Sequence, residues 1–321
     1  MTPASTENLY GARASSNVWL SLHKYLEMVR FSHTIFALPF AILSLIWTLA
    51  VPLPTQTSLG GNAVLRWVGI LICMVTARNF AMSVNRWADA KFDALNPRTD
   101  KRHIPSGKLT STAVIGFGVG NAIAFVLACL LFWPNPLPIL LCLPVLLWIG
   151  GYSFAKRFTW AVHLWLGAAL MMAPVCTWIA LRGELLLKHP LDFAPAMWLG
   201  IAVFFWVAGF DMIYACQDEK VDQQLGLYSM ASRFGAWGAL RIAAACHAIM
   251  VAVLLAMPWM CPTLSLGPLW IVTVIGIGVI LTYEHRLVSP QDLTRINLAF
   301  FYLNAIISVV LCVAGGVDAW L

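Results

Sequence analysis

Long apolar runs alternate with short polar segments along the whole chain. A run of about 20 apolar residues can cross a hydrocarbon core about 30 Å thick as a helix. Nine such runs occur, at residues 33–53, 63–85, 112–133, 137–155, 160–181, 196–216, 237–257, 264–283 and 295–315. The pattern predicts an all-α polytopic membrane protein in which nine transmembrane helices form one bundle.

Composition supports a membrane location. Of the 321 residues, 60% are hydrophobic and only 11% are charged, which is too little charge for the surface of a soluble protein of this size. The eight cysteines show no paired spacing. We interpret them as small apolar packing residues rather than disulfide partners or metal ligands.

The first 30 residues lack an apolar core followed by a cleavage site, so we expect no cleavable signal peptide. Residues 18–31 instead have the pattern of an amphipathic helix on the membrane surface. We therefore divide the chain into a tail with an interfacial helix (1–32), the helical bundle (33–315) and a short external C-terminal tail (316–321).

Lysine and arginine predict the orientation. Fifteen of the twenty fall in the N-terminus and in segments 86–111, 156–159, 215–236 and 284–295. Positive residues favour the cytoplasmic side, so nine crossings place the N-terminus in the cytoplasm and the C-terminus outside. These loops also account for the net charge of +6. Membrane lipid or a phosphorylated ligand explains that charge without a nucleic-acid partner.

Polar side chains follow one helix face at the cytoplasmic ends of two runs. At 100° per residue, the members of each set fall on a stripe about 80–100° wide. The first set is Arg78, Asn85, Asp89 and Asp93. The second set is Asp211, Tyr214, Asp218 and Asp222.

One such stripe alone could be a solvated face just outside the membrane. Asp211, however, follows the letters FFWVAG and lies within an apolar run. A charge there costs roughly 2.5–3.5 kcal/mol on insertion scales, and an ionisable residue at such a position indicates function. Two stripes, each of which starts within an apolar run, favour a functional site.

The two stripes would form a single site if their helices face each other. Asp89, Asp93, Asp218 and Asp222 would then make a cup of four carboxylates, which needs neutralising groups. Carboxylate oxygens without nearby His or Cys suit Mg²⁺, which completes its octahedron with water and substrate phosphates. The predicted metal ligands are these four aspartates, and the implied ligand is a diphosphate.

Basic residues follow the first stripe directly. We expect Arg98, Lys101 and Arg102 to contact phosphate. The same role is open to Lys156, Arg157 and Arg233, although the preference of positive residues for the cytoplasmic side would also explain their positions. The segment 94–111 contains Asn-Pro and Pro-Ser-Gly and has the composition of an ordered lid over the site.

These residues resemble the motifs of the UbiA superfamily of intramembrane prenyltransferases. The letters NRWADAKFD (85–93) match its N-x-x-x-D-x-x-x-D motif, and DEKVD (218–222), preceded by DMIY (211–214), matches its second motif. Further matches are RFSHTIFALPFA (30–41), NPRTDKRHIPSGKL (96–109), YSFAKRFT (152–159) and GLYSMASRFG (226–235). Arg86 departs from the pattern, because many relatives carry an acid there. The branch that prenylates 4-hydroxybenzoate or other aromatic acids is most similar, and a branch acting on a dihydroxynaphthoate is nearly as similar.

The resemblance implies Mg²⁺-dependent transfer of a polyprenyl group from its diphosphate to a ring carbon of a small aromatic acid, in quinone biosynthesis. It also implies a bacterial cytoplasmic (inner) membrane, with the site facing the cytoplasm. Asn85 would add a neutral metal ligand or orient the first carboxylate. Tyr214 would face the allylic cation, and Asp211 would take or polarise a phenolic proton.

The acceptor's carboxylate needs a cationic partner. Arg78 and Arg30 could bind it through paired hydrogen bonds. Arg78 could instead pair with Asp211, and Arg30 could extend to the membrane interface. His163 and His247 are isolated in apolar runs, where we expect internal hydrogen bonds.

Two other activities are compatible with buried acids. A haem farnesyltransferase would use the same cup on a porphyrin. An ion-coupled secondary transporter would place its acids near the bilayer midplane, between halves of opposed topology. Here the acids cluster at one membrane face and nine crossings do not divide into inverted halves, so the sequence favours prenyl transfer.

Overall fold

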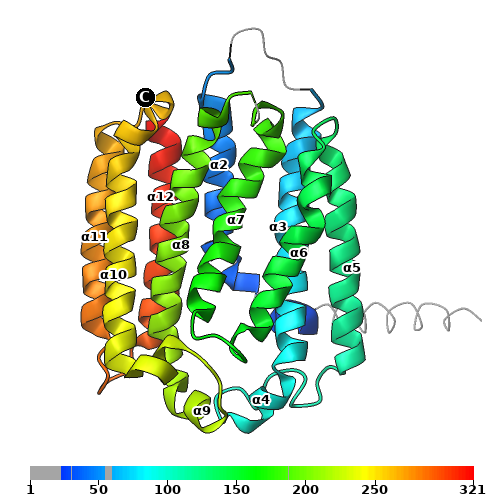
Figure 1. Cartoon of the computed structure of the whole chain (residues 1–321), viewed down its shortest axis with the longest axis vertical. Coiled ribbons are helices and arrows are strands. Elements are labelled where there is room, and N and C mark those ends of the chain that lie inside the picture. Colours follow the sequence, from blue (N-terminus) through cyan, green and yellow to red (C-terminus); the bar gives the residue numbers. More distant parts are fainter. Residues whose placement is uncertain (1–22, 30, 55–59, 187) are drawn as a thin grey trace, which may run out of the picture.

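The computed structural model describes residues 23–29, 31–54, 60–186 and 188–321, and this part of the chain folds into a bundle of helices joined by turns and short connections (Figure 1). The long helices run up and down across the bundle. They are α3 (Ala63–Ala88), α5 (Ser111–Cys129), α6 (Leu137–Ala155), α7 (Val162–Arg182), α8 (Ala194–Ala215), α10 (Met230–Met260), α11 (Pro268–Leu287) and α12 (Asn304–Asp318). The all-α prediction is confirmed for the described residues.

Eight helices within the described ranges are long and apolar enough to cross a membrane. The first predicted span, 33–53, corresponds to a shorter apolar stretch, Thr34–Ala50. It consists of a 3₁₀ turn, η1 (Phe31–Phe36), and the 13-residue helix α2 (Leu38–Ala50). Pro39 occupies the first turn of α2, where a missing N–H costs nothing, whereas it would interrupt a helix that continued from residue 31. Length therefore supports eight of the nine predicted crossings.

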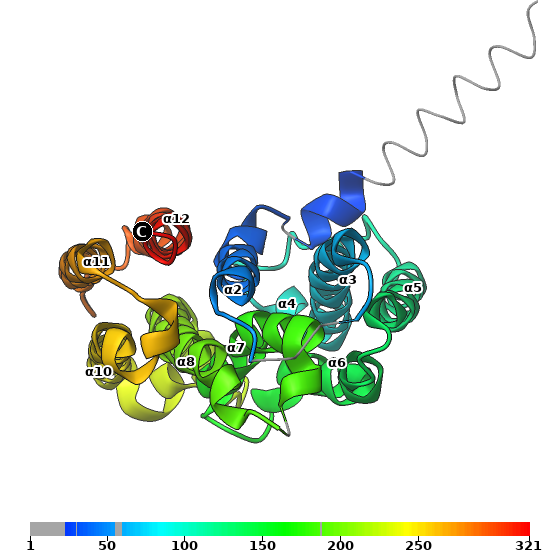
Figure 2. The ribbon, with the colours of Figure 1, turned by 90° about the horizontal axis from the view of Figure 1, so that it is seen from above.

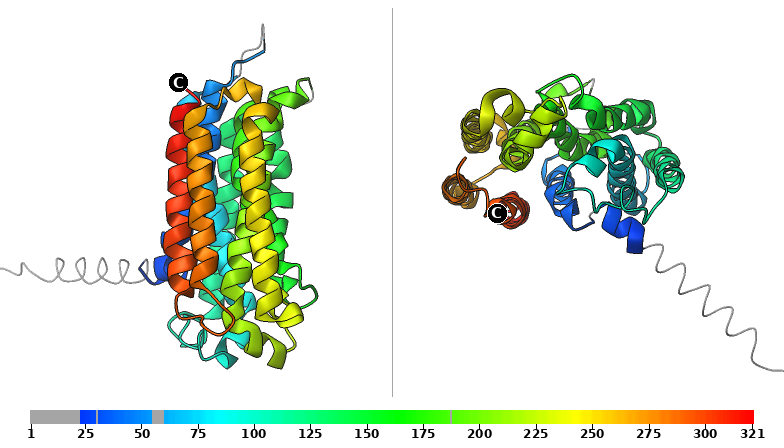
Figure 3. Two further views of the ribbon diagram at one scale, coloured as in Figure 1. Left: turned by 90° about the vertical axis from the view of Figure 1, so that its left-hand side faces the viewer. Right: turned by 90° about the horizontal axis from the view of Figure 1, so that it is seen from below.

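Two short helices carry the acidic motifs at the same end of the bundle. These are α4 (Ala90–Leu95) and α9 (Glu219–Gln224), and both side views place them at the end opposite the C-terminus (Figures 1 and 3). The predicted interfacial helix, 18–31, lies partly outside the described residues, and its described part is helical at 23–28.

Helix α8 lies at the centre of the packing, against α7 on one side and α10 on the other (Figure 2). Glycines allow both contacts. A β-carbon at Gly167 would overlap the carbonyl of Phe204, and one at Gly209 would overlap the ring of His247. Small residues commonly permit such close approach between membrane helices, where van der Waals packing provides most of the association energy.

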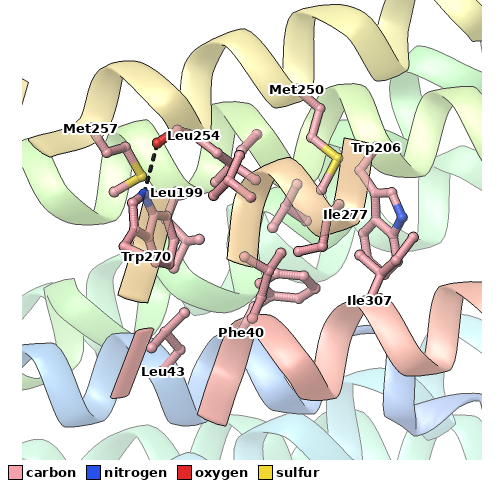
Figure 4. Packing of buried hydrophobic residues seen from close by; sticks show 14 of the residues in the cluster. Phe40, Leu43, Leu199, Trp206, Met250, Leu254, Met257, Trp270, Ile277 and Ile307 are labelled. Carbon is pink, nitrogen blue, oxygen red and sulfur yellow. Dashed lines mark hydrogen bonds between the residues drawn. The ribbon is translucent and has the colours of Figure 1, made fainter. Parts of the chain in front are cut away.

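A buried aromatic core fills the space between α2, α8, α10, α11 and α12 (Figure 4). Trp206 and Trp270 are fully buried in it, and the indole N–H of Trp270 donates to the carbonyl of Leu254 at 2.8 Å. A satisfied N–H lets the large ring pack in the apolar interior without a desolvation penalty. The core gives one wall of the bundle a fixed shape.

A buried arginine closes the end away from the acidic motifs. Arg182 forms an ion pair with Asp192 and donates to the carbonyls of Thr48 and Val51 at 3.1 and 3.0 Å. These contacts join the ends of α2 and α7 to η4 (Pro190–Phe193). A buried charge is stable only when it is paired and hydrogen-bonded in this way.

Candidate active site

The structure brings the four predicted metal-ligand aspartates to one polar cleft. Helix α3 ends at Ala88, and Asp89 caps it and leads into α4, which carries Asp93. Helix α8 continues through η5 (Cys216–Asp218) into α9. The resulting cleft has a volume of about 160 Å³ and is lined by Asp89, Asp93, Asp218 and Asp222, among other residues.

Three of these carboxylates are paired with basic residues. We expect two of these, Arg98 and Arg102, to contact phosphate, and the same role is open to the third, Lys156. Arg98 donates through Nε to Asp218 at 2.9 Å, Arg102 donates to Asp93 at 2.7 Å, and Lys156 donates to Asp222 at 3.0 Å. Both partners line the cleft in each case. Burial lowers the pKa of Lys156, but contact with Asp222 and the charge of Asp218 outweigh burial and raise this pKa above its usual value.

Asp89 has a different environment. It accepts a hydrogen bond from the amide nitrogen of Asn85 at 2.8 Å. Burial, together with the nearby charge of Asp93, raises the pKa of Asp89 from 3.8 to about 6. Its surroundings thus disfavour the charged form of Asp89, and a cation in the cleft would stabilise that form.

Arg86, the departure from the common motif, contacts Asn85 directly. It donates to the side-chain oxygen of Asn85 at 3.3 Å and to the carbonyl of Met28 at 3.3 Å. The amide oxygen of Asn85 is therefore engaged while its nitrogen faces Asp89. Of the two roles considered for Asn85, this geometry favours orienting the first carboxylate.

A larger apolar cavity of about 340 Å³ adjoins the cleft. Its walls are mostly aliphatic, aromatic and cysteine side chains from α3, α5, α6 and α7. Three residues line both spaces, namely Asn85, Tyr152 and Asp211. The polar and apolar spaces therefore meet at these residues.

Asp211 pairs with a histidine that the sequence did not single out as a site residue. The Nδ1 atom of His163 lies 2.7 Å from a carboxylate oxygen of Asp211. The sequence predicts only an internal hydrogen bond for His163, and nothing in its local sequence indicates that the bond reaches Asp211. The contact crosses from α7 to α8, so periodicity within one helix could not reveal it.

Tyr214 lies between a cation and another aromatic ring. Its hydroxyl accepts from Arg98 at 3.0 Å, and its ring centroid is 4.2 Å from that of Phe300. Phe300 also lines the apolar cavity. It belongs to a π-helical turn, η7 (Leu298–Leu303), of a kind often found at functional sites. The turn breaks the regular period, so the sequence pattern missed Phe300.

The remaining predicted binding residues are more scattered. Arg157 lines the cleft and donates to the carbonyl of Ala88 at 2.7 Å. Arg78 lines the apolar cavity and donates to the carbonyl of Val29 at 3.2 Å. Lys101 and Arg233 are exposed and are not among the described residues that line the cleft. Arg30 lies outside the described residues.

A metal ion would need ligands from outside the protein. Within the part of the chain that the structure describes, no three His, Cys, Asp or Glu side chains converge closely enough to hold one. This arrangement is compatible with Mg²⁺, which typically uses one or two carboxylates and takes its other ligands from water and substrate phosphates.

Comparison with known proteins identifies the family. The model of the UbiA prenyltransferase family matches residues 37–306. The chain belongs to this family. The predicted superfamily and the expectation of a prenyl-transferring membrane enzyme are therefore confirmed, and membership does not support the transporter alternative.

Three curated relatives share the description 4-hydroxybenzoate octaprenyltransferase. The protein from Pseudomonas fluorescens (strain SBW25) is 33% identical over 203 residues, which cover 61% of this chain and 63% of that relative. The protein from Thiobacillus denitrificans is 29% identical over 270 residues, covering 82% and 85% of the two chains. The protein from Shewanella sediminis is 28% identical over 290 residues, covering 88% and 92%.

Solved structures have the same fold. An apo UbiA homolog from Aeropyrum pernix K1 superposes with a TM-score of 0.74 at 27% identity, covering 90% of this chain and 98% of that one. A UbiA homolog from Archaeoglobus fulgidus bound to GPP and Mg²⁺ gives a TM-score of 0.65 at 17% identity, covering 93% and 100%. At this lower identity the likeness concerns the fold alone.

Proposed function

We propose that this UbiA-family protein transfers a polyprenyl group from its diphosphate to a ring carbon of a small aromatic acid of the 4-hydroxybenzoate type, in quinone biosynthesis. One observation carries the proposal. A cleft with four carboxylates and several cations meets an apolar cavity at Asn85, Tyr152 and Asp211. A prenyl diphosphate has the same division into a charged head and an apolar tail.

Mg²⁺ fits the donor set of the cleft. One oxygen of Asp93, Oδ2, is buried without a hydrogen-bond partner, and the pKa of Asp89 is raised to about 6 by burial and by Asp93. Both features favour a bound cation. Asp89, Asp93, Asp218 and Asp222 would hold Mg²⁺ ions, one or two carboxylates to each ion, and the bound ions would neutralise the charge on the departing diphosphate as Lewis acids. The A. fulgidus homolog, with the same fold, is described as bound to GPP and Mg²⁺.

The cations of the cleft would exchange partners when substrate binds. Arg98, Arg102 and Lys156 neutralise carboxylates in the structure. A metal ion on those carboxylates would release the three cations to donate to diphosphate oxygens, which accept strong charge-assisted hydrogen bonds. Tyr214 would hold Arg98 in place during the exchange, because its hydroxyl accepts from that guanidinium.

The apolar cavity would receive the first isoprene units. Most of its lining residues are apolar, and a dry pocket would keep an allylic cation from reacting with water. A longer tail would continue between helices into lipid. Tail length therefore does not need to match the cavity volume.

The aromatic acceptor would bind where the two spaces meet. Asp211 would accept the phenolic proton and make the ring electron-rich. Arg78, which lines the cavity from the same helix as Asn85, would bind the acceptor's carboxylate. The relatives' descriptions favour 4-hydroxybenzoate over a dihydroxynaphthoate or haem. We further propose that the cleft faces the cytoplasm from a bacterial inner membrane, because the basic loops surround it.

A single assay tests the activity and the acceptor together. Membranes containing the protein are incubated with radioactive prenyl diphosphate and, in parallel, with 4-hydroxybenzoate, a dihydroxynaphthoate or haem. We expect labelled product from 4-hydroxybenzoate, inhibition by EDTA and recovery with added Mg²⁺. Label in haem alone would replace the proposed acceptor, and turnover that is insensitive to EDTA would contradict the metal site.

A further inference from the structure

His163 is almost completely buried at the start of α7, at 1% exposure, and both of its ring nitrogens are engaged. Nδ1 lies 2.7 Å from an oxygen of Asp211. Nε2 lies 3.3 Å from the backbone nitrogen of Met230, whose N–H points to it. Met230 is the first residue of α10, where backbone N–H groups have no partner within the helix.

These two contacts decide which nitrogen carries the proton. A backbone N–H can only donate, so Nε2 must accept from Met230. A neutral imidazole has one donor and one acceptor, and the proton therefore resides on Nδ1. Nδ1–H then donates to Asp211, which is held as a hydrogen-bond acceptor. A hydrogen bond to one ring nitrogen of a histidine commonly decides whether the other ring nitrogen carries the proton, and so whether that nitrogen donates to its own partner.

We propose that His163 is a positioning residue for the acceptor site. It fixes the rotamer of Asp211 and keeps this carboxylate as an acceptor at the meeting point of the two cavities. The site then selects aromatic substrates that present a hydroxyl donor to Asp211. This inference rests on the proposed function and deepens it, because it names a ring hydroxyl as the group that the site recognises.

Substitution at 163 separates positioning from simple packing. His163→Gln keeps both contacts, since an amide can donate to Asp211 and accept from Met230. His163→Leu keeps the bulk and removes both. We expect kcat/KM for 4-hydroxybenzoate to fall about 100-fold in His163→Leu, as for loss of general-base positioning, and to stay within about threefold of wild type in His163→Gln. KM for the prenyl diphosphate should not change in either variant.

His247 provides a matched control. It is equally buried, at 2% exposure, and its ring contacts His285 and the carbonyl of Trp206 instead of the site. His247→Leu should lower the yield of folded protein without a selective loss for the aromatic substrate. Equal kinetic losses in His247→Leu and His163→Leu would overturn the proposal, because they would indicate packing alone.

A spectroscopic measurement needs no turnover. In protein labelled with ¹⁵N-histidine, the resonances that disappear in His163→Gln belong to His163. We expect a protonated Nδ1 and an unprotonated Nε2, and the reverse pattern would overturn the proposal. If Asp211→Asn abolishes transfer while His163→Leu is fully active, the positioning role is wrong and the proposed function stands. If wild type prenylates no aromatic acid, the proposed function fails, and the resonances still decide the tautomer.

Discussion

At the scale of single residues, the cleft is a set of charges that neutralise one another in pairs. Asp218 is buried and accepts from both Arg98 and Asn96, at 2.9 and 3.1 Å. Removing one of the two charged side chains of a buried ion pair leaves the other charge uncompensated. The same pairing neutralises the carboxylates of the cleft while no substrate is bound. The basic side chains can then change partners when a diphosphate brings its own negative charge.

Asp218→Asn tests whether this carboxylate serves the reaction. The amide keeps the shape and removes the charge that a metal ion requires, so we expect prenyl transfer to fall by about 100-fold or more. The neighbouring acid Glu219, which accepts from the backbone N–H of Ala236 at 3.2 Å, provides the control as Glu219→Gln. Transfer measured in membranes, normalised to protein content, should stay near wild type in the control. Normal turnover in Asp218→Asn would contradict the proposed metal site.

At the scale of elements, a π-helical turn brings an aromatic ring to the site. Asn304 follows η7 and is fully buried. Its amide nitrogen donates to Glu284 at 3.1 Å and to the carbonyl of Phe300 at 3.2 Å, and its oxygen accepts from Trp206 at 2.6 Å. One side chain thus ties the turn to α8 and α11 and fixes the ring of Phe300 against Tyr214.

Asn304→Leu should loosen this turn. Trp206 and Glu284 would lose a buried partner, so we expect the free energy of unfolding to fall by about 1–3 kcal/mol. Activity should also fall, because Phe300 no longer supports Tyr214. Thermal unfolding in detergent and transfer assays measure the two effects. Asn121→Leu is the control, since Asn121 pairs with Asn79 between α3 and α5, away from the cleft. Equal loss of activity in both variants would contradict a specific role for the turn.

At the scale of the whole molecule, helices from both halves of the chain enclose one apolar cavity next to one polar cleft. Cys73 and Cys176 line the cavity, as do Cys129 and Cys142. The prediction that the cysteines are apolar packing residues agrees with their free state in the described residues. Their positions also make them reporters of what occupies the cavity.

Thiol protection tests whether the cavity holds the prenyl tail. A variant that retains only Cys176 should react more slowly with an apolar maleimide when prenyl diphosphate and Mg²⁺ are present. Ligand at about ten times its Kd leaves about a tenth of the cavities open, so protection should be about tenfold. A variant that retains only Cys312, on α12 away from the cavity, is the control. Equal rates with and without ligand at Cys176 would show that the tail binds elsewhere.

The sequence by itself determined the helices and the two acid stripes, because apolar length and a period of 3.6 residues are local properties. It located six of the eight long helices within about four residues at each end, whereas α10 begins seven residues before its predicted start and α12 nine residues after. It also predicted from their spacing that Asp89, Asp93, Asp218 and Asp222 belong to one site, and the structure places all four at one cleft. It misjudged the length of the first span, since η1 and Pro39 shorten that helix. It also identified the family through motifs that repeat the same local spacing.

Only the tertiary structure decided how these elements meet. Arg98 contacts Asp218 across 120 residues of sequence, and His163 reaches Asp211 from another helix. Phe300 comes to Tyr214 through an irregular turn. Such contacts depend on which helix faces pack together and on the close approaches that glycines allow. Periodicity describes one helix at a time, so the partners of each charge and the cavity beside them follow from packing.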